Sequence, residues 1–229
     1  MTTSAQPEGA IRVKICGLRR PEDVRAATMG ASPAAYVGFV FVAASPRAVT
    51  AQEAAALAQE TPAGVEKVGL FVDPTDDQIR ETLEVCPLDM LQLHGGETPA
   101  RVAEIRSAFG RPVIKALPIG GAEDVAAIAA HEEVADEILC DAKPGADAAI
   151  PGGSGHAFDW ALVAGRTWRR PWLLAGGLTS ENVADAVAAS GARRLDVSSG
   201  VERIRGVKDP DRIRAFLEAA ARIAVPPPA

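Results

Sequence analysis

Two residues of this 229-residue chain combine a side chain that can transfer protons with a position near the end of a short apolar run. Cys16 lies near the end of IRVKICGL (11–18), and Asp141 lies near the end of EILCDAK (137–143). A thiol, with a reference pKa of about 8.5, needs only modest tuning to act as a general base. A carboxyl group in a partly apolar setting can act as a general acid. The alternative is structural: Cys16 fills the core and Asp141 caps a loop.

Two further polar residues follow apolar runs in the same way. His94 ends LDMLQLH (88–94) and is a candidate ligand, acid or satisfied structural histidine. Arg47 follows Ser45 and Pro46, and a guanidinium in a loop that proline makes rigid suits bidentate capture of a carboxylate. A surface arginine is the equally open alternative.

Two loops rich in glycine and small hydroxyl residues occur late in the chain. The first, LLAGGLTSENV (173–183), contains Gly176 and Gly177. The second, LDVSSGVE (195–202), contains Asp196, Ser198, Ser199 and Gly200. Glycine lets the backbone approach a ligand closely, and free N–H groups at a turn bind anions. The pair of loops therefore favours a phosphate site over two ordinary turns.

The elements that must position these residues alternate along the whole chain. Apolar runs at 11–18, 34–42, 66–72, 88–94, 111–119, 137–143, 171–177 and 193–201 are each followed by a helical stretch. Such near-continuous apolar runs are typical of parallel strands covered on both faces. Eight units of about 25–30 residues predict a single (β/α)8 TIM barrel, an α/β fold with its site at the carboxyl ends of the strands. A doubly wound sheet is the alternative, although CGLRRPE lacks the GxGxxG pattern.

The predicted barrel domain spans residues 11–224, between an N-terminal extension (1–10) that we expect to be flexible and a C-terminal tail (225–229). The segment KPGADAAIPGGSGH (143–156) is longer than the usual connection of about 2–6 residues after a barrel strand. Its length favours a flap over the site, and a passive insertion is the alternative.

Composition excludes several classes of protein. The formal net charge is -6, which argues against nucleic-acid binding, and no apolar stretch is long enough to span a membrane. The start of the chain does not resemble a secretory signal. The three cysteines fit neither a disulfide framework nor a metal site, so a cytoplasmic protein with reduced thiols is expected. Cys86 and Cys140 are interpreted as core residues.

Taken in order, seven segments resemble the phosphoribosylanthranilate isomerase family of tryptophan biosynthesis. They are KICGL, GFVF…SPR, VGLFV, LQLHGGE, GGSG…FDW, LAGGL…NV and DVSSGVE…GVKD, and they extend from about residue 11 to about residue 217. The combination of KICG, QLHG and DVSSGVE at these spacings is what makes the resemblance specific.

The resemblance implies an aldose–ketose isomerase, an intramolecular oxidoreductase of aromatic amino-acid biosynthesis. It would rearrange N-(5-phosphoribosyl)anthranilate to 1-(2-carboxyphenylamino)-1-deoxyribulose 5-phosphate without a metal or cofactor. By similarity, Cys16 is the general base, Asp141 the general acid and Arg47 the ligand of the anthranilate carboxylate. The resemblance further implies phosphate binding at Gly176, Gly177, Ser199 and Gly200, positioning roles for His94 and Asp196, and a monomer or homodimer.

One departure from the family pattern lies in the predicted flap, where His156 occupies the usual position of a lysine. Another barrel isomerase acting on a phosphosugar is the nearest rival, but such an enzyme typically uses a pair of aspartates, and the first strand here ends in Cys16. A non-catalytic phosphate-binding barrel is the second rival. It would not need Cys16, Arg47 and Asp141 together.

Overall fold

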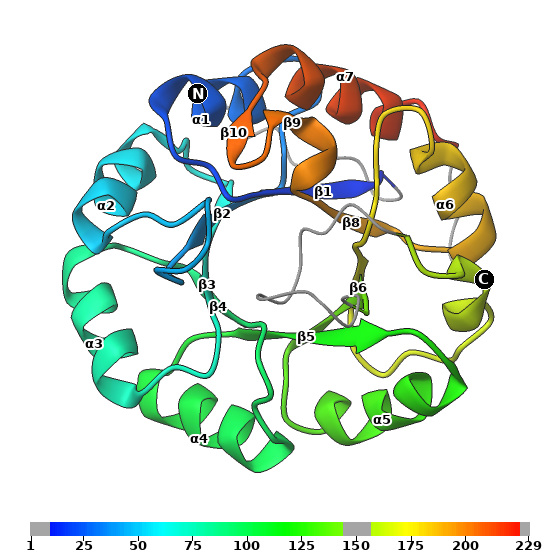
Figure 1. The fold of residues 1–229 in the computed structure, drawn as a ribbon, viewed down its shortest axis with the longest axis horizontal. Coiled ribbons are helices and arrows are strands. Elements are labelled where there is room, and N and C mark those ends of the chain that lie inside the picture. Colours follow the sequence, from blue (N-terminus) through cyan, green and yellow to red (C-terminus); the bar gives the residue numbers. More distant parts are fainter. Residues whose placement is uncertain (1–9, 144–156, 225–229) are drawn as a thin grey trace.

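Eight parallel strands close into a barrel in the computed structural model, which describes residues 10–143 and 157–224 (Figure 1). The strands follow chain order around the ring, and the last completes it by pairing with the first. Their bounds are β1 (Arg12–Cys16), β2 (Tyr36–Val40), β3 (Glu66–Phe71), β4 (Met90–Leu93), β5 (Val113–Ile119), β6 (Glu137–Ala142), β7 (Trp172–Leu174) and β8 (Arg194–Val197). The closed ring confirms the predicted (β/α)8 barrel and excludes the doubly wound sheet, which has two open edges.

The helices surround this ring (Figure 1). They are α1 (Pro21–Thr28), α2 (Ala51–Glu60), α3 (Asp76–Val85), α4 (Pro99–Phe109), α5 (Ala122–Glu132), α6 (Val183–Ser190) and α7 (Pro210–Ala221), with the 3-10 helices η1 (Trp160–Val163) and η2 (Ser199–Val201). Helix α1 begins at Pro21, a suitable first residue because the N–H group that proline lacks would have no partner within the helix there. Thr50 and Thr75 begin α2 and α3 with capping boxes.

Alternate residues of each strand face two different layers. Ile15 on β1 and Cys140 on β6 are fully buried between the barrel and the helices. Their neighbours therefore point into the barrel, because successive side chains of a strand face opposite ways. Asp141 is one of these inward residues, as the position of Cys140 in the sequence predicts. The middle of the barrel is apolar, with Tyr36, Val68, Met90, Ile114, Leu139 and Leu173 in one cluster.

Charged pairs close the amino-terminal end of the barrel. Arg12 lies 3.2 Å from Glu66, and its guanidinium lies 4.7 Å from the centre of the Tyr36 ring. Arg194 on β8 forms an ion pair with Glu137 on β6. These contacts fill the amino-terminal end of the barrel, so the pocket opens at the carboxyl ends of the strands.

Two details differ from the sequence-based prediction. A small antiparallel hairpin, β9 (Glu202–Ile204) and β10 (Val207–Lys208), follows η2 and was not expected. Gly206 makes its turn with a φ of 82°, in the left-handed region that favours glycine. An apolar side chain such as that of Met29 is expected in the core, but Met29 is 56% exposed because the chain leaves α1 at Thr28.

Several predicted segments lie outside the described residues. They are most of the N-terminal extension (1–9), most of the predicted flap (144–156), including His156, and the tail (225–229).

Candidate functional site

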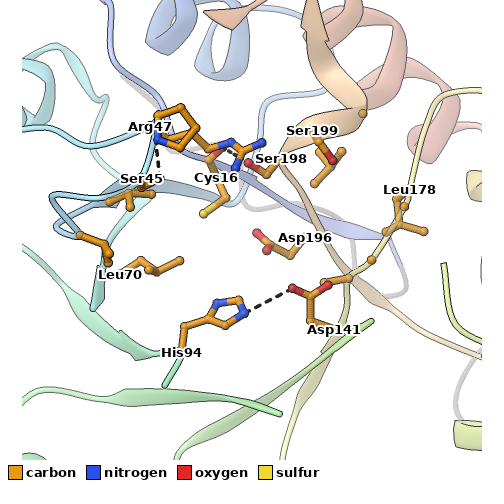
Figure 2. A pocket seen from close by; sticks show the side chains of 18 of the residues that line it. Cys16, Ser45, Arg47, Leu70, His94, Asp141, Leu178, Asp196, Ser198 and Ser199 are labelled. Atoms are coloured by element: carbon orange, nitrogen blue, oxygen red, sulfur yellow. Dashed lines mark hydrogen bonds and ion pairs between the residues drawn. The ribbon is translucent and has the colours of Figure 1, made fainter. Parts of the chain in front are cut away.

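A pocket opens at the carboxyl end of the barrel (Figure 2). It encloses about 800 Å³, including the space open to solvent at its mouth, which is within the usual range for small-molecule sites. All the site residues predicted from the sequence border this pocket: Cys16, Arg47, His94, Asp141, Gly176, Gly177, Asp196, Ser199 and Gly200. Residues far apart in the chain are thus brought to one site by the strand ends that carry them.

Cys16 lies at the end of β1, 4% exposed, beside a buried ion pair. Lys14, two residues earlier on the same strand face, places its Nζ atom 2.8 Å from Oδ1 of Asp196 on β8. Burial raises the pKa of the Cys16 thiol, and Asp196 adds to this, whereas the Lys14 ammonium opposes both. The thiol therefore borders the pocket with a cation directly beneath it.

His94 connects Asp141 to the interior of the barrel. Its Nε2 atom lies 3.3 Å from Oδ2 of Asp141 (Figure 2). Its Nδ1 atom lies 2.9 Å from the side-chain nitrogen of Gln92, which is fully buried. The other carboxylate oxygen of Asp141 accepts a hydrogen bond from the backbone N–H of Ala142 at 2.8 Å. Asp141 is therefore held from two sides, with its carboxyl group at the pocket wall.

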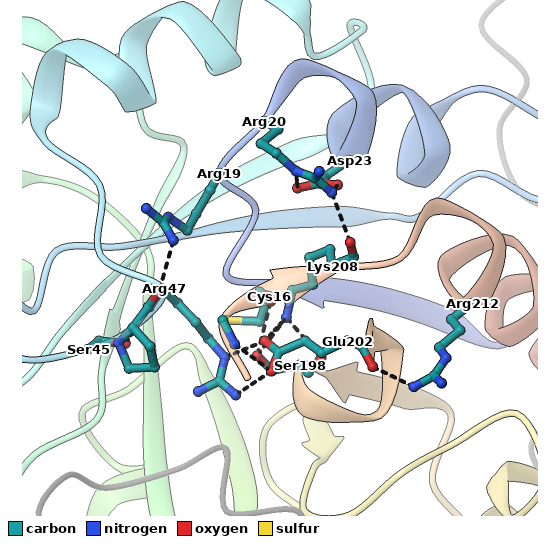
Figure 3. Close-up of polar contacts among 12 residues, drawn as sticks. Cys16, Arg19, Arg20, Asp23, Ser45, Arg47, Ser198, Glu202, Lys208 and Arg212 are labelled. Carbon is teal, nitrogen blue, oxygen red and sulfur yellow. Dashed lines mark hydrogen bonds and ion pairs between the residues drawn. The ribbon is translucent and has the colours of Figure 1, made fainter. Parts of the chain in front are cut away.

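Arg47 is not a surface arginine: it is 7% exposed and paired with a buried carboxylate (Figure 3). Its Nε and Nη2 atoms donate to the two oxygens of Glu202 at 2.7 and 3.0 Å. Lys208 donates to Glu202 at 2.8 Å and also to the carbonyl oxygen of Ser198, at the same distance. Although burial opposes it, pairing with Arg47 and Lys208 lowers the pKa of Glu202 to about 2. Arg47 is thus held at the rim by an ionised partner.

The two glycine-rich loops approach each other closely at one side of the pocket. A Cβ atom on Gly200 would lie 1.9 Å from the carbonyl oxygen of Leu178, so only glycine fits there. Gly176 and Gly177 have φ values of 84° and 65°. Among the described residues, no backbone hydrogen bond outside the helices and strands uses the N–H groups of Gly177, Ser199 or Gly200. These loops can therefore offer backbone donors to an anion.

Four residues of this site were not identified from the sequence: Lys14, Gln92, Glu202 and Lys208. The alternation of strand side chains carries a signal for the first two, because Lys14 shares a face with Cys16 and Gln92 shares one with His94. Glu202 and Lys208 lie on the unpredicted hairpin β9–β10, so no strand pattern indicated them.

Within residues 10–143 and 157–224, no group of three or more His, Cys, Asp or Glu side chains is arranged to hold a metal ion. No helix in the same part of the chain is long and apolar enough to cross a membrane.

Comparison with known proteins gives one consistent family. Residues 13–219 match the family described as N-(5'phosphoribosyl)anthranilate (PRA) isomerase. A relative from Cereibacter sphaeroides, named N-(5'-phosphoribosyl)anthranilate isomerase, is 55% identical over 210 residues, which cover 92% of this chain and 98% of the relative. A relative of the same name from Paracoccus denitrificans is 54% identical over 211 residues, covering 92% and 97%.

Solved structures give the same result. The crystal structure of phosphoribosyl anthranilate isomerase from Thermotoga maritima matches with a TM-score of 0.80 at 34% identity, covering 92% of this chain and 98% of that one. A structure of such an isomerase in complex with reduced 1-(o-carboxyphenylamino)-1-deoxyribulose 5-phosphate matches with a TM-score of 0.77 at 33% identity, with the same coverage.

Proposed function

The chain belongs to the N-(5'-phosphoribosyl)anthranilate isomerase family, and we propose that the pocket at its strand ends carries out that reaction by general acid–base catalysis. The reaction is the Amadori rearrangement of N-(5-phosphoribosyl)anthranilate in tryptophan biosynthesis, an aldose–ketose isomerisation. The observation that carries the proposal is that Cys16 and Asp141 border one pocket (Figure 2), with β7 and β8 between their strands.

The first step opens the sugar ring. Asp141 donates its proton to the furanose oxygen, the bond from that oxygen to C1 breaks, and the anthranilate nitrogen lone pair forms an iminium with C1. The 3.3 Å contact with His94 and the backbone N–H of Ala142 fix the direction of the carboxyl group for this transfer. A fixed acid accelerates the reaction more than a mobile one, because it needs no reorganisation during the proton transfer.

The second step removes a proton from C2. The iminium makes this proton acidic, so the thiolate of Cys16 is a sufficient base. The C–H electrons form the C1=C2 double bond, and the iminium nitrogen recovers its lone pair. The resulting enolamine then tautomerises: the C2 hydroxyl loses its proton, C1 gains one, and C2 becomes the ketone. Acid and base act from different strands, so each has its own side of the substrate.

Substrate binding uses the remaining residues of the pocket. Arg47 binds the anthranilate carboxylate, adding to or competing with its contact to Glu202. The backbone of Gly176, Gly177, Ser199 and Gly200 binds the phosphate, as exposed N–H groups of such loops commonly do. Asp196 and His94 have positioning roles: Asp196 holds Lys14, and His94 holds Asp141. The catalytic thiol must stay reduced, which suits a cytoplasmic location.

The test is a direct assay. Phosphoribosylanthranilate is prepared in situ and its fluorescence is followed with the purified protein. The wild type should turn it over, and Cys16→Ser and Asp141→Asn should each lose activity by at least about a hundredfold, the usual contribution of a positioned acid or base. Circular dichroism should show intact folding.

Cys86→Ala is the matched control, since Cys86 is buried at the end of α3 and does not border the pocket. It should retain activity. Full activity in Cys16→Ser or Asp141→Asn would refute the acid–base assignment, and a wild type without turnover would refute the function.

A further inference from the structure

A lysine is buried inside the barrel directly below the proposed base. Lys14 and Cys16 are two residues apart on β1, so both side chains point inward. Lys14 is fully buried, and its Nζ atom lies 2.8 Å from Oδ1 of Asp196. A lysine is almost never fully buried unless it is paired.

The neighbouring strand leaves room for the two groups to meet. Gly38 on β2 is the cross-strand partner of Cys16. A Cβ atom at Gly38 would lie 3.0 Å from the sulfur of Cys16 and 3.2 Å from Nζ of Lys14. Both atoms therefore face the same side-chain-free patch of β2, and the charge of the Lys14 ammonium lowers the pKa of the Cys16 thiol.

Fold stability alone gives little reason for such a pair. A buried ion pair loses the hydration of both charges, and replacing it with apolar side chains is often neutral or stabilising. The same layers of the barrel could be filled with branched aliphatic residues. The position of the charges, immediately beside the thiol, is what apolar residues would not reproduce.

We propose that Lys14 is a positioning residue for the general base, whose ammonium group, anchored by Asp196, stabilises the thiolate form of Cys16. The inference rests on the proposed function, in which the thiolate removes the C2 proton. Asp196 has two opposing effects: it holds Lys14 in place, and its own charge disfavours the thiolate. The thiol is thus tuned by the balance between these two charges.

The other surroundings of Cys16 determine how far Lys14 can act. From β10, Lys208 also favours the thiolate, although it is engaged by Glu202. The side facing β2 and β3 carries the apolar residues Val40 and Leu70, which make the cluster around Cys16. Arg47 lies on the same side of the pocket as Cys16, against Gly17, whereas His94 and Asp141 lie across the pocket (Figure 2). Lys14 is fully buried on the same face of β1 as the thiol, and it lowers the pKa of Cys16 more than Lys208 does.

The test measures ionisation of Cys16 without substrate. The rate of alkylation by iodoacetamide is followed against pH, and the peptide containing Cys16 is quantified by mass spectrometry, which separates it from Cys86 and Cys140. In Lys14→Met the profile should move to higher pH by more than one unit, so alkylation at pH 7 should slow at least about tenfold. In Asp196→Asn it should move in the opposite direction.

Loss of Lys14 alone leaves Asp196 buried without its cation, which destabilises the fold. The double variant Lys14→Met/Asp196→Asn leaves no unpaired charge and should still show a profile at higher pH than the wild type. The matched control is Lys115→Met, which removes the lysine of another fully buried pair, with Glu97 at 2.6 Å. It should leave the alkylation profile of Cys16 unchanged.

The outcomes separate this inference from the proposed function. A Cys16 profile that is the same in the wild type, Lys14→Met and the double variant would overturn the role of Lys14, whatever the activity of Cys16→Ser. A shifted alkylation profile, combined with turnover whose pH dependence does not move, would instead remove Cys16 as the base and leave the ionic tuning in place.

Discussion

The Nε2 atom of His94 lies 3.3 Å from Oδ2 of Asp141, so the ring of a strand-end histidine touches the proposed general acid. On the opposite edge of the ring, Nδ1 lies 2.9 Å from the side-chain nitrogen of Gln92. With this amide nitrogen as the donor, Nδ1 is the acceptor, and we predict that a neutral ring carries its proton on Nε2, the atom that faces Asp141. The prediction is that a buried glutamine selects the tautomer of the histidine beside the proposed acid.

These contacts predict what happens when the hydrogen bond between Gln92 and His94 is reversed. In Gln92→Glu the new carboxylate accepts from Nδ1, so the ring proton is drawn away from Asp141. We expect kcat to fall about tenfold, which corresponds to about 1.4 kcal/mol, with little change in KM. Long-range ¹H–¹⁵N NMR should show the His94 proton on Nε2 in the wild type and protonation of Nδ1 in the variant.

Gln78→Glu is a matched control on α3, far from the pocket, and should change neither kcat nor the His94 signals. A wild-type ring with its proton on Nδ1 would contradict the assignment.

A second prediction concerns the carboxylate that holds Arg47. Glu202→Gln removes the charge that Arg47 and Lys208 share, leaving two buried cations near each other (Figure 3). Because Arg47 is the proposed ligand of the substrate carboxylate, KM should rise at least about tenfold while kcat changes less. Steady-state kinetics measure both.

Glu218→Gln is the matched control, because Glu218 on α7 forms an exposed ion pair with Arg222, just after the end of that helix. Exposed pairs contribute little, so its kinetics should match the wild type. An unchanged KM in Glu202→Gln would show that the orientation of Arg47 does not depend on Glu202.

A third prediction follows from the ionisation of the same carboxylate. The pKa of Glu202 is lowered from 4.5 to about 2 in the folded chain, with Arg47 and Lys208 overcoming the cost of burial. A lowered folded-state pKa stabilises the fold above pH 4.5, and this contribution disappears as pH falls through about 2. The difference amounts to about 3 kcal/mol.

Urea unfolding at pH 7, 4.5, 3.5 and 2.5 measures this contribution. The gap in unfolding free energy between the wild type and Glu202→Gln should be constant between pH 7 and 5 and narrow as pH falls below 4.5. A gap that keeps its full size at pH 2.5 would contradict the ionisation assigned to Glu202.

The residues that border the pocket could be predicted from the sequence, because their positions at the strand ends follow a simple rule. In a parallel barrel all carboxyl ends meet at one rim, so locating Cys16, His94 and Asp141 at the ends of apolar runs was enough to bring them together. The opposite facing of Cys140 and Asp141 follows from strand alternation in the same way.

The partners of the site residues could not be predicted by that rule. Lys14 and Asp196 are 182 positions apart, and nothing local to either indicates that they pair. Arg47 has a partner 155 positions away, Glu202, carried by a hairpin whose two strands are too short to give a periodic pattern. The sequence therefore indicates which residues border the pocket, and the three-dimensional contacts decide how each is charged and oriented.

A fourth prediction concerns the contact between the two glycine-rich loops. The Cβ of Gly200→Ala would approach the Leu178 carbonyl oxygen to 1.9 Å, so the loops after β7 and β8 must separate. Backbone donors that were held together then no longer converge on one anion. We expect KM for the substrate and the inhibition constant of inorganic phosphate to rise together, each at least about tenfold, because both reflect the same lost donors.

Gly191→Ala distinguishes this effect from general strain. Gly191 has a φ of 75° at the end of α6, and a Cβ there would meet nothing within 4 Å. This variant should lose on the order of 1 kcal/mol of stability from the backbone conformation alone, with both constants unchanged. If Gly200→Ala raised KM without weakening phosphate inhibition, the loops would be shaping another part of the pocket, and the phosphate would have to bind elsewhere.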